Sequence, residues 1–364
     1  NGFVENFLEL KEDLLAEGVH FNSDTDTEVI VHLIEHFLAT ELGLEDAVRQ
    51  ALKQLKGAHG VVVFSAEEPD KIIAARIGNA GGVVVGIGEN ENFIASDIPA
   101  ILDHTRRMVF LESHQMAIVK QHSYEVKTLD GRKVNTQEHM IGWDPVAAEK
   151  GEFRHFMQKE IHEQVRSLTD TLAGRVDFDD GIIRLPQLNL TPEKAKAIER
   201  IVITACGTAA YAGMVGVTLL ERIARIPSSL VIASEFRYSD PIVDANTVVI
   251  AISQSGETAD TLAAMDEARR RGATVWSVVN AIGSQAMRVA DGYISMQTGP
   301  EVGVASTKAF TAPLVDMYML AVLLADLRGT IKPEKRKDLV ADLRLIPDMV
   351  GRCLDHEAEV LQTA

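Results

Sequence analysis

A short polar stretch of the sequence, Ser253 to Thr258, has the residue types of an anion-binding loop. It follows the apolar, β-branched run Val248 to Ile252, which is typical of a buried strand of a parallel sheet, and it precedes apolar residues at helical spacing. The first turn of a helix leaves backbone N–H groups without partners and carries the positive end of the helix dipole. We therefore predict a phosphate cradle at this strand-to-helix junction.

The hydroxyl groups of the loop come from Ser253, Ser255 and Thr258, and Gly256 lets the backbone approach a ligand closely. No lysine follows as in a Walker loop, so nothing favours a nucleoside triphosphate with magnesium over a phosphorylated small molecule. The alternative is an ordinary strand-to-helix loop capped by serine, because serine and threonine are common helix caps. From the loop alone, both interpretations stay open.

The elements around this loop alternate between strand and helix from about Asn189 to Gly329. This alternation predicts a doubly wound parallel sheet, whose ligands bind at the carboxyl ends of the strands. The loop Cys206 to Ala209 and the Ser253 to Thr258 loop are therefore expected on one rim, where a single ligand can contact both. The five expected strands are residues 201–205, 230–233, 248–252, 274–279 and 292–296.

Residues 1–142 have a different order, with helical segments first and short strands afterwards, which predicts an α+β layered domain. Residues 143–188 read as an interdomain connector with one long amphipathic helix from Phe153 to Leu172. Residues 189–329 form the parallel-sheet domain, and residues 330–364 read as a helical extension. In the first domain, helices are expected at 8–18, 27–39 and 44–55, and strands at 60–64, 72–75, 82–85, 92–95, 108–111 and 116–119.

The chain has 364 residues and a formal charge of 36 minus 53, or −17, so nucleic acid and anionic membranes are not expected partners. Its two cysteines, Cys206 and Cys353, lack metal-ligand spacing and fit a reducing cytoplasm, and no metal or cofactor is predicted. The most apolar segment, Ala309 to Leu327, contains Pro313 and Asp316. We therefore expect a buried helix there and not a membrane span.

Several longer motifs are specific enough to compare with known families. Those of the second half are Cys206-Gly207-Thr208, Ala233 to Tyr238, Ser253 to Leu262 and Gly303 to Ala309; those of the first half are Asn1 to Asn6, Ser23 to Val29 and Glu91 to Asp97. The second half resembles the first sugar isomerase (SIS) domain of the glutamine:fructose-6-phosphate aminotransferase, or glucosamine-6-phosphate synthase, family. The first half looks like its glutaminase domain, of the N-terminal nucleophile hydrolase type. Arg154 to Ile161 is similar to its interdomain segment.

The resemblance implies that a glutaminase half releases ammonia from glutamine, and that an isomerase half uses it to convert fructose 6-phosphate into glucosamine 6-phosphate. By motif, Asn1 and Gly2 match the oxyanion hole, and Asp26 matches the carboxylate that binds the α-ammonium group of glutamine. It also implies a cytoplasmic homodimer. In the SIS domain, the sugar-phosphate cradle matches Ser253, Gln254, Ser255 and Thr258, and the neighbouring sugar contacts match Thr208, Val304 and Ser306.

Each of these residues also has a simpler interpretation. Isolated Asn-Gly pairs are usually turns, and Asp26 could cap the helix that follows it. Ser306 with Thr307 could cap the next helix, and Cys206 reads as structural. For the whole chain, the alternatives are a non-catalytic SIS regulator that binds a sugar phosphate, beside which a helix-turn-helix is expected, and a sugar-amine deglycase.

Other parts that the resemblance implies have no counterpart among the 364 residues. The nucleophilic amino-terminal cysteine should lie before Asn1, and the second SIS domain, with the glutamate and lysine of isomerisation, should lie beyond Ala364. We therefore expect this chain by itself to have neither glutaminase nor synthase activity. It is expected to keep parts of the glutamine-binding and sugar-phosphate-binding surfaces.

Overall fold

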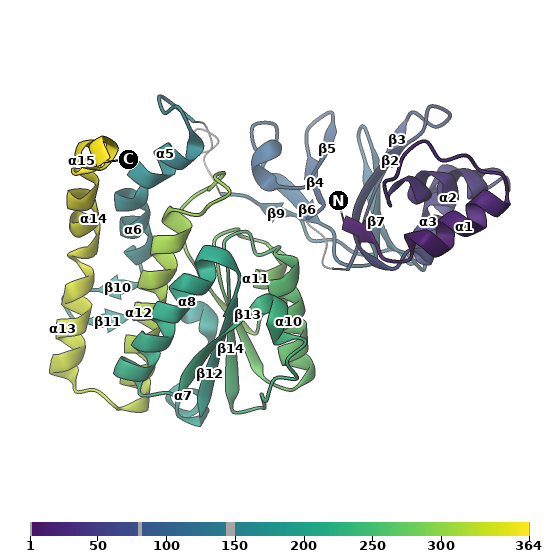
Figure 1. The fold of residues 1–364 in the computed structure, drawn as a ribbon. Coiled ribbons are helices and arrows are strands. Elements are labelled where there is room, and N and C mark those ends of the chain that lie inside the picture. The colour runs from purple at the N-terminus through teal and green to yellow at the C-terminus, as the bar shows by residue number, and fades with distance from the viewer. Residues whose placement is uncertain (1, 79–81, 143–149, 364) are drawn as a thin grey trace. The chain divides into compact units, whose positions relative to one another are not determined.

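The computed structural model describes residues 2–78, 82–142 and 150–363. The chain divides into two compact units, residues 1–142 and 143–364. Figure 1 shows the elements of both units.

The first unit is built of helices and two antiparallel sheets. Its elements are α1 (Phe7–Ala16), α2 (Glu28–Leu38), α3 (Leu44–Gln54), β1 (Gly2–Val4), β2 (Gly57–Phe64), β3 (Lys71–Ile77), β4 (Val84–Ile87), β5 (Asn92–Ala95), β6 (Arg107–Phe110), β7 (Gln115–Lys120), β8 (Tyr124–Thr128) and β9 (His139–Met140). The sheets have the orders β1-β2-β3-β7-β8 and β5-β4-β6-β9. The predicted helices and strands are present in the predicted order, with ends shifted by a few residues, but β1, which precedes the helices, and β9 were not predicted.

Strand β3 shows how the layers of this unit are held together. Ile73 and Ala75 join the core that contains residues of α1, α2 and α3, whereas Ala74 joins the core that contains β4 and β6. Successive side chains of a strand point to opposite faces, so one strand supplies both cores. The predicted α+β layering of this region is confirmed.

The second unit contains the predicted five-stranded parallel sheet, in the order β13-β12-β14-β15-β16. Its main elements are α5 (Phe156–His162), α6 (Gln164–Leu172), α7 (Pro192–Ala197), β12 (Arg200–Ala205), α8 (Gly207–Leu219), β13 (Ser228–Ile232), α9 (Ala233–Phe236), β14 (Thr247–Ser253), α10 (Ala259–Arg270), β15 (Thr274–Val279), α11 (Gln285–Val289), β16 (Gly292–Ser295), α12 (Lys308–Arg328), α13 (Pro333–Leu343), α14 (Ile346–Leu354) and α15 (Glu357–Thr363). Two two-residue strands, β10 (Val176–Asp177) and β11 (Ile182–Ile183), pair with each other.

Helices cover both faces of the parallel sheet (Figure 1). On β12, Ile201 and Ile203 face the core that contains residues of α8 and α12, and Val202 faces the core that contains residues of α9 and α10. Because both faces are buried, the strands read as continuous apolar runs. The doubly wound sheet is therefore confirmed.

The connector differs from the prediction of one long helix. Two helices, α5 and α6, meet at Glu163, where ψ is −10°. At this junction the side-chain amide of Gln164 donates to the carbonyl of Ile161 at 3.0 Å. A side chain that competes for a backbone acceptor weakens the helical pattern locally.

Among the described residues, α12 is the one helix that is long and apolar enough to cross a membrane by length and composition, but 61% of its most apolar window is buried inside the unit. It is thus a core helix, as predicted. It also carries a buried ion pair, because Asp316 is 0% exposed and its Oδ1 lies 2.9 Å from Nη1 of Arg175. Burial raises the pKa of Asp316 to about 7, against the opposing charge of Arg175.

This pKa predicts a pH-dependent stability. Between about pH 4, the unfolded pKa, and pH 7, the folded state keeps a proton that the unfolded state releases, so the contribution of Asp316 to stability is lost as the pH rises. We expect the free energy of unfolding of Asp316→Asn, relative to the unchanged protein, to rise across this range by up to about 1.4 kcal/mol per pH unit. Urea unfolding at several pH values measures it, and parallel curves for the two proteins contradict it.

Candidate sugar-phosphate site

The loop between β14 and α10 has an internal hydrogen-bond framework. Ser253 Oγ accepts from the N–H of Gly256 at 3.0 Å and lies 3.1 Å from Oγ1 of Thr258. Ser255 Oγ accepts from the N–H of Glu257 at 3.2 Å. Ser253 is buried, so its hydroxyl shapes the turn, whereas Ser255 and Thr258 are half-buried and reach the surface.

The helix that follows this loop keeps its first amides open. Thr258 stands at the N-cap position of α10, but its side chain makes no capping hydrogen bond. The first-turn N–H groups of this 12-residue helix therefore point out of the loop with the positive end of the helix dipole. An anion beside Ser255 and Thr258 would receive both kinds of hydrogen bond.

The residues that follow β15 form backbone hydrogen bonds to the Ser253 to Thr258 loop. Gln254 O accepts from the N–H groups of Asn280 and Ala281 at 3.2 and 3.1 Å, and Gly256 O accepts from Ala286 N–H at 2.9 Å. Gly256 has a φ of +65°, and a Cβ placed there would lie 2.1 Å from Oγ of Ser284. Glycine is therefore required at position 256 for backbone conformation and for space.

The predicted partner loop lies beside it on the same rim. β12 and β14 are parallel neighbours with Thr204 opposite Ala251, so the loops after them leave the sheet at the same edge. The sheet order reverses between these two strands, since β13 lies on the far side of β12. This is the topological switch point, where ligands of doubly wound sheets bind. Thr208, half-buried in the first turn of α8, is thus on the rim that carries the predicted cradle.

The third predicted motif, Gly303 to Ala309, follows closely after Glu301, whose carbonyl accepts from Nε2 of Gln254 in the predicted cradle at 3.3 Å. The carboxylate of Glu301 accepts from the N–H groups of Thr307 and Ala309 at 2.9 and 3.1 Å. Glu301 therefore caps α12, whereas Thr307, at the N-cap position, makes no side-chain cap. Burial raises the pKa of Glu301, and the amides at the start of α12 oppose this rise.

Between these anchors lie the two predicted sugar contacts, Val304 and Ser306. Val304 is fully exposed and Ser306 is half-buried. The sequence interpretation of Ser306 and Thr307 as the helix cap is corrected in one respect, because the capping carboxylate comes from Glu301. Sequence reasoning missed Glu301, since a glutamate in a loop reads as a solvated side chain and only the fold buries it.

In the first unit, the predicted glutamine-binding residues are described only in part. Asn1 lies outside the described residues. Gly2 opens β1 opposite His59 with a φ of +122°, and a Cβ placed there would lie 2.0 Å from the carbonyl oxygen of Ala58, so only glycine fits. Asp26 Oδ2 accepts from the N–H of Val4 at 2.6 Å.

The simpler interpretation, that Asp26 caps α2, is wrong. The N-cap position is Thr27, and Asp26 bonds to the backbone of Val4 in β1. Glu28 instead stabilises the loop before α2, because its carboxylate accepts from the N–H groups of Asn22 and Ser23 at 2.7 and 2.8 Å. The amide of Asn22 and the hydroxyl of Ser23 lower the pKa of Glu28 to about 2.

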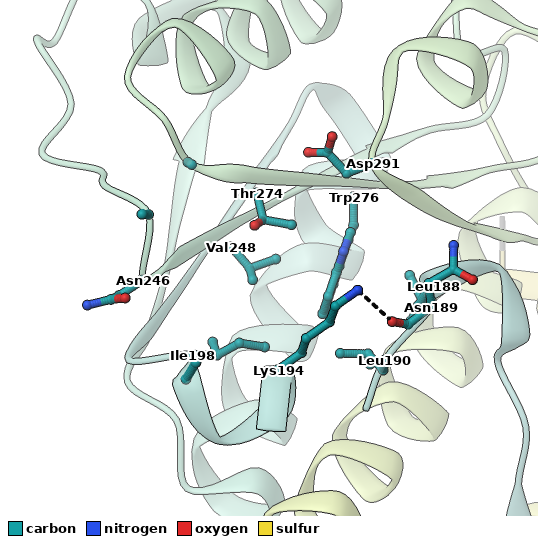
Figure 2. Close-up of a pocket in the computed structure, with 13 residues that line it drawn as sticks. Leu188, Asn189, Leu190, Lys194, Ile198, Asn246, Val248, Thr274, Trp276 and Asp291 are labelled. Atoms are coloured by element: carbon teal, nitrogen blue, oxygen red, sulfur yellow. Dashed lines mark hydrogen bonds between the residues drawn. The ribbon is translucent and has the colours of Figure 1, made fainter. Parts of the chain in front are cut away.

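A cavity of about 450 Å³ lies at the opposite, amino edge of the parallel sheet (Figure 2). Its walls include Asn246, Thr274 and Asp291, at the starts of three strands, together with Trp276 and Lys194. None of the predicted site residues lines it. No group of three or more metal-ligating side chains occurs in the part of the chain that the structure describes.

Comparison with known proteins matches residues 1–103 to a glutamine amidotransferase domain and residues 195–323 to an SIS domain. The chain is 45% identical over 362 residues to a glutamine–fructose-6-phosphate aminotransferase (isomerizing) of Caldanaerobacter subterraneus, and 44% identical over 364 residues to one of Symbiobacterium thermophilum. All of this chain is covered in both comparisons, but it spans 59% of the length of each relative.

Among solved structures, the C-terminal domain of glucosamine-fructose-6-phosphate aminotransferase from Francisella tularensis matches with a TM-score of 0.56 and 33% identity. The match covers 59% of this chain and 60% of that one. The chain therefore contains a glutamine amidotransferase domain followed by an SIS domain, and over its whole length it is similar to proteins named glutamine–fructose-6-phosphate aminotransferase (isomerizing).

Proposed function

We propose that this chain supplies binding surfaces for glutamine and fructose 6-phosphate in an enzyme that forms glucosamine 6-phosphate and glutamate. Hydrolysis of glutamine releases ammonia, which replaces the C2 carbonyl oxygen of the sugar before isomerisation. The observation that carries the proposal is the Ser253 to Thr258 loop at the uncapped start of α10, on the rim at the switch point of the sheet.

Within this proposal the residues have separate roles. The hydroxyls of Ser255 and Thr258 and the first amides of α10 bind the phosphate, and the buried Ser253 with Gln254 holds the loop in shape. Thr208, Val304 and Ser306 contact the sugar. In the first unit, Asn1 and Gly2 form the oxyanion hole, and Asp26 binds the α-ammonium group of glutamine.

The amidotransferase region favours this activity over an SIS regulator, which has no use for a glutamine site, and the names of the relatives favour it over a deglycase. We also propose that the enzyme is a homodimer of the cytoplasm. Both cysteines, Cys206 and Cys353, are free thiols, as a reducing compartment requires.

The proposal predicts that Ser255→Ala weakens binding of fructose 6-phosphate roughly tenfold, the effect of losing one hydrogen bond to a charged group. Titration calorimetry of the 364-residue chain measures this change. Ser229→Ala, at an exposed position on strand β13, is the matched control and should bind as the unchanged chain does. Equal affinities for Ser255→Ala and the unchanged chain contradict the cradle.

A further inference from the structure

The connector helix α5 carries a buried carboxylate that the sequence does not single out. Glu160 is 2% exposed, and its Oε1 accepts from the N–H groups of Val302 and Gly303 at 2.6 and 3.1 Å. Its Oε2 lies 3.2 Å from the same Gly303 nitrogen. Among the described residues no lysine, arginine or histidine forms a salt bridge with Glu160, so these two amides are its charge-stabilising partners.

The backbone at Gly303 packs closely against α5. A Cβ at position 303 would lie 2.5 Å from Oε2 of Glu160 and 3.6 Å from Cα of Met157. The backbone of residue 303 therefore rests directly against the carboxylate, with no room for a side chain. This need for glycine arises from the neighbouring helix and not from a left-handed backbone.

An ion pair holds the other end of the same segment. Lys308, the first residue of α12, is 2% exposed, and its Nζ lies 2.7 Å from Oε2 of Glu163. Glu160 and Glu163, the residue that follows α5, are one helical turn apart. The carboxyl-terminal end of α5 therefore contacts residues 302–303 and residue 308. The predicted sugar contacts, Val304 and Ser306, lie between these two points.

From these contacts we infer that Glu160 is a positioning residue of the sugar site, which fixes the backbone of Val302 and Gly303 and so sets where residues 304–306 lie relative to the phosphate cradle. The inference rests on the proposed function, and it gives a residue of the connector a role in the sugar site. Burying a carboxylate costs free energy unless it is fully hydrogen-bonded, and here both bonds go to the segment that presents the sugar contacts.

Two ligands separate this role from a purely structural one. Inorganic phosphate needs only the Ser253 to Thr258 cradle, whereas fructose 6-phosphate also needs residues 304–306. We expect Glu160→Ala to weaken fructose 6-phosphate binding roughly tenfold and to change inorganic phosphate binding by less than about twofold. Glu160→Gln should recover most of the loss, because its Oε1 can still accept from both amides.

Calorimetric titration of the 364-residue chain with each ligand measures these changes, with Glu152→Ala, an exposed glutamate before α5, as the matched control. Gly303→Ala tests the contact from its other side, since the new methyl group pushes against Glu160. It should cause the same ligand-selective loss, which becomes smaller when Glu160 is already alanine. This second variant keeps the test decisive if Glu160→Ala fails to fold.

The outcomes distinguish the inference from the function on which it rests. Equal loss of both ligands in Glu160→Ala and Gly303→Ala, or no loss of either, overturns the positioning role while the unchanged chain still binds fructose 6-phosphate. An unchanged chain that does not bind fructose 6-phosphate contradicts the proposed function itself, and the inference with it. A selective loss of the sugar phosphate, recovered by Glu160→Gln, supports both.

Discussion

Gly256→Ala is expected to lower the free energy of unfolding by about 3 kcal/mol and to abolish phosphate binding. The new Cβ meets Ser284 Oγ at 2.1 Å and Ser284 Cβ at 2.6 Å, and the φ of +65° is unfavourable for alanine. A left-handed residue costs about 1–2 kcal/mol, and overpacking adds about 1–3 kcal/mol. Because Gly256 N–H bonds to Ser253 Oγ, relief of the clash moves the cradle itself. Urea unfolding and phosphate titration measure the two effects.

Gly207→Ala is the matched control for this variant. Gly207 stands on the same rim with a φ of +56°, but a Cβ there has no neighbour within 4 Å. Gly207→Ala should therefore lower the free energy of unfolding only by the cost of a left-handed alanine, about 1–2 kcal/mol. If the two variants lose equal stability, the clash with Ser284 is not what requires glycine at position 256.

Arg175→Met is expected to destabilise the protein by about 3–5 kcal/mol at pH 8, where Asp316 is ionised in the folded state. The substitution removes the cation that lowers the pKa of Asp316, so the buried carboxyl has to stay charged without a partner or take up a proton at pH 8, and both cost free energy. It also removes the bond from Arg175 to the carbonyl of Ser295. Asp316 Oδ2 already has no hydrogen-bond partner among the described residues, so no other group compensates. The loss should be smaller at pH 5, where Asp316 is protonated.

The double variant Arg175→Met with Asp316→Val provides the control. Replacing both charges by apolar side chains of comparable size removes the unpaired carboxylate, and such replacements are often neutral or stabilising. Most of the lost free energy of unfolding should therefore return. Equal destabilisation of the single and double variants at pH 8 contradicts the account, because it places the cost in packing and not in the orphaned charge.

The sequence predicted those parts of the fold that depend on local pattern. The apolar runs of β12 and β14, and the polar residues Ser253 to Thr258, can each be recognised from about ten consecutive residues. This is because a strand buried on both faces has to be continuously apolar. The order of elements then fixes a doubly wound sheet, because parallel crossovers are right-handed and short. The connector was the weaker prediction, because one long helix was expected and two helices meet at Glu163.

The proposed phosphate cradle, Ser253 to Thr258, is a local feature of the chain, and the sequence by itself determined its residue types, its place between strand and helix, and the family to which its motifs are similar. Only the tertiary structure decided which charged side chains are buried around it. Glu160 meets residue 302 across 142 positions, and Arg175 meets Asp316 across 141, so no local pattern distinguishes these charges from solvated ones. Burial of a charge depends on what the distant chain packs against it, and that packing is settled only when the sheet and its helices assemble.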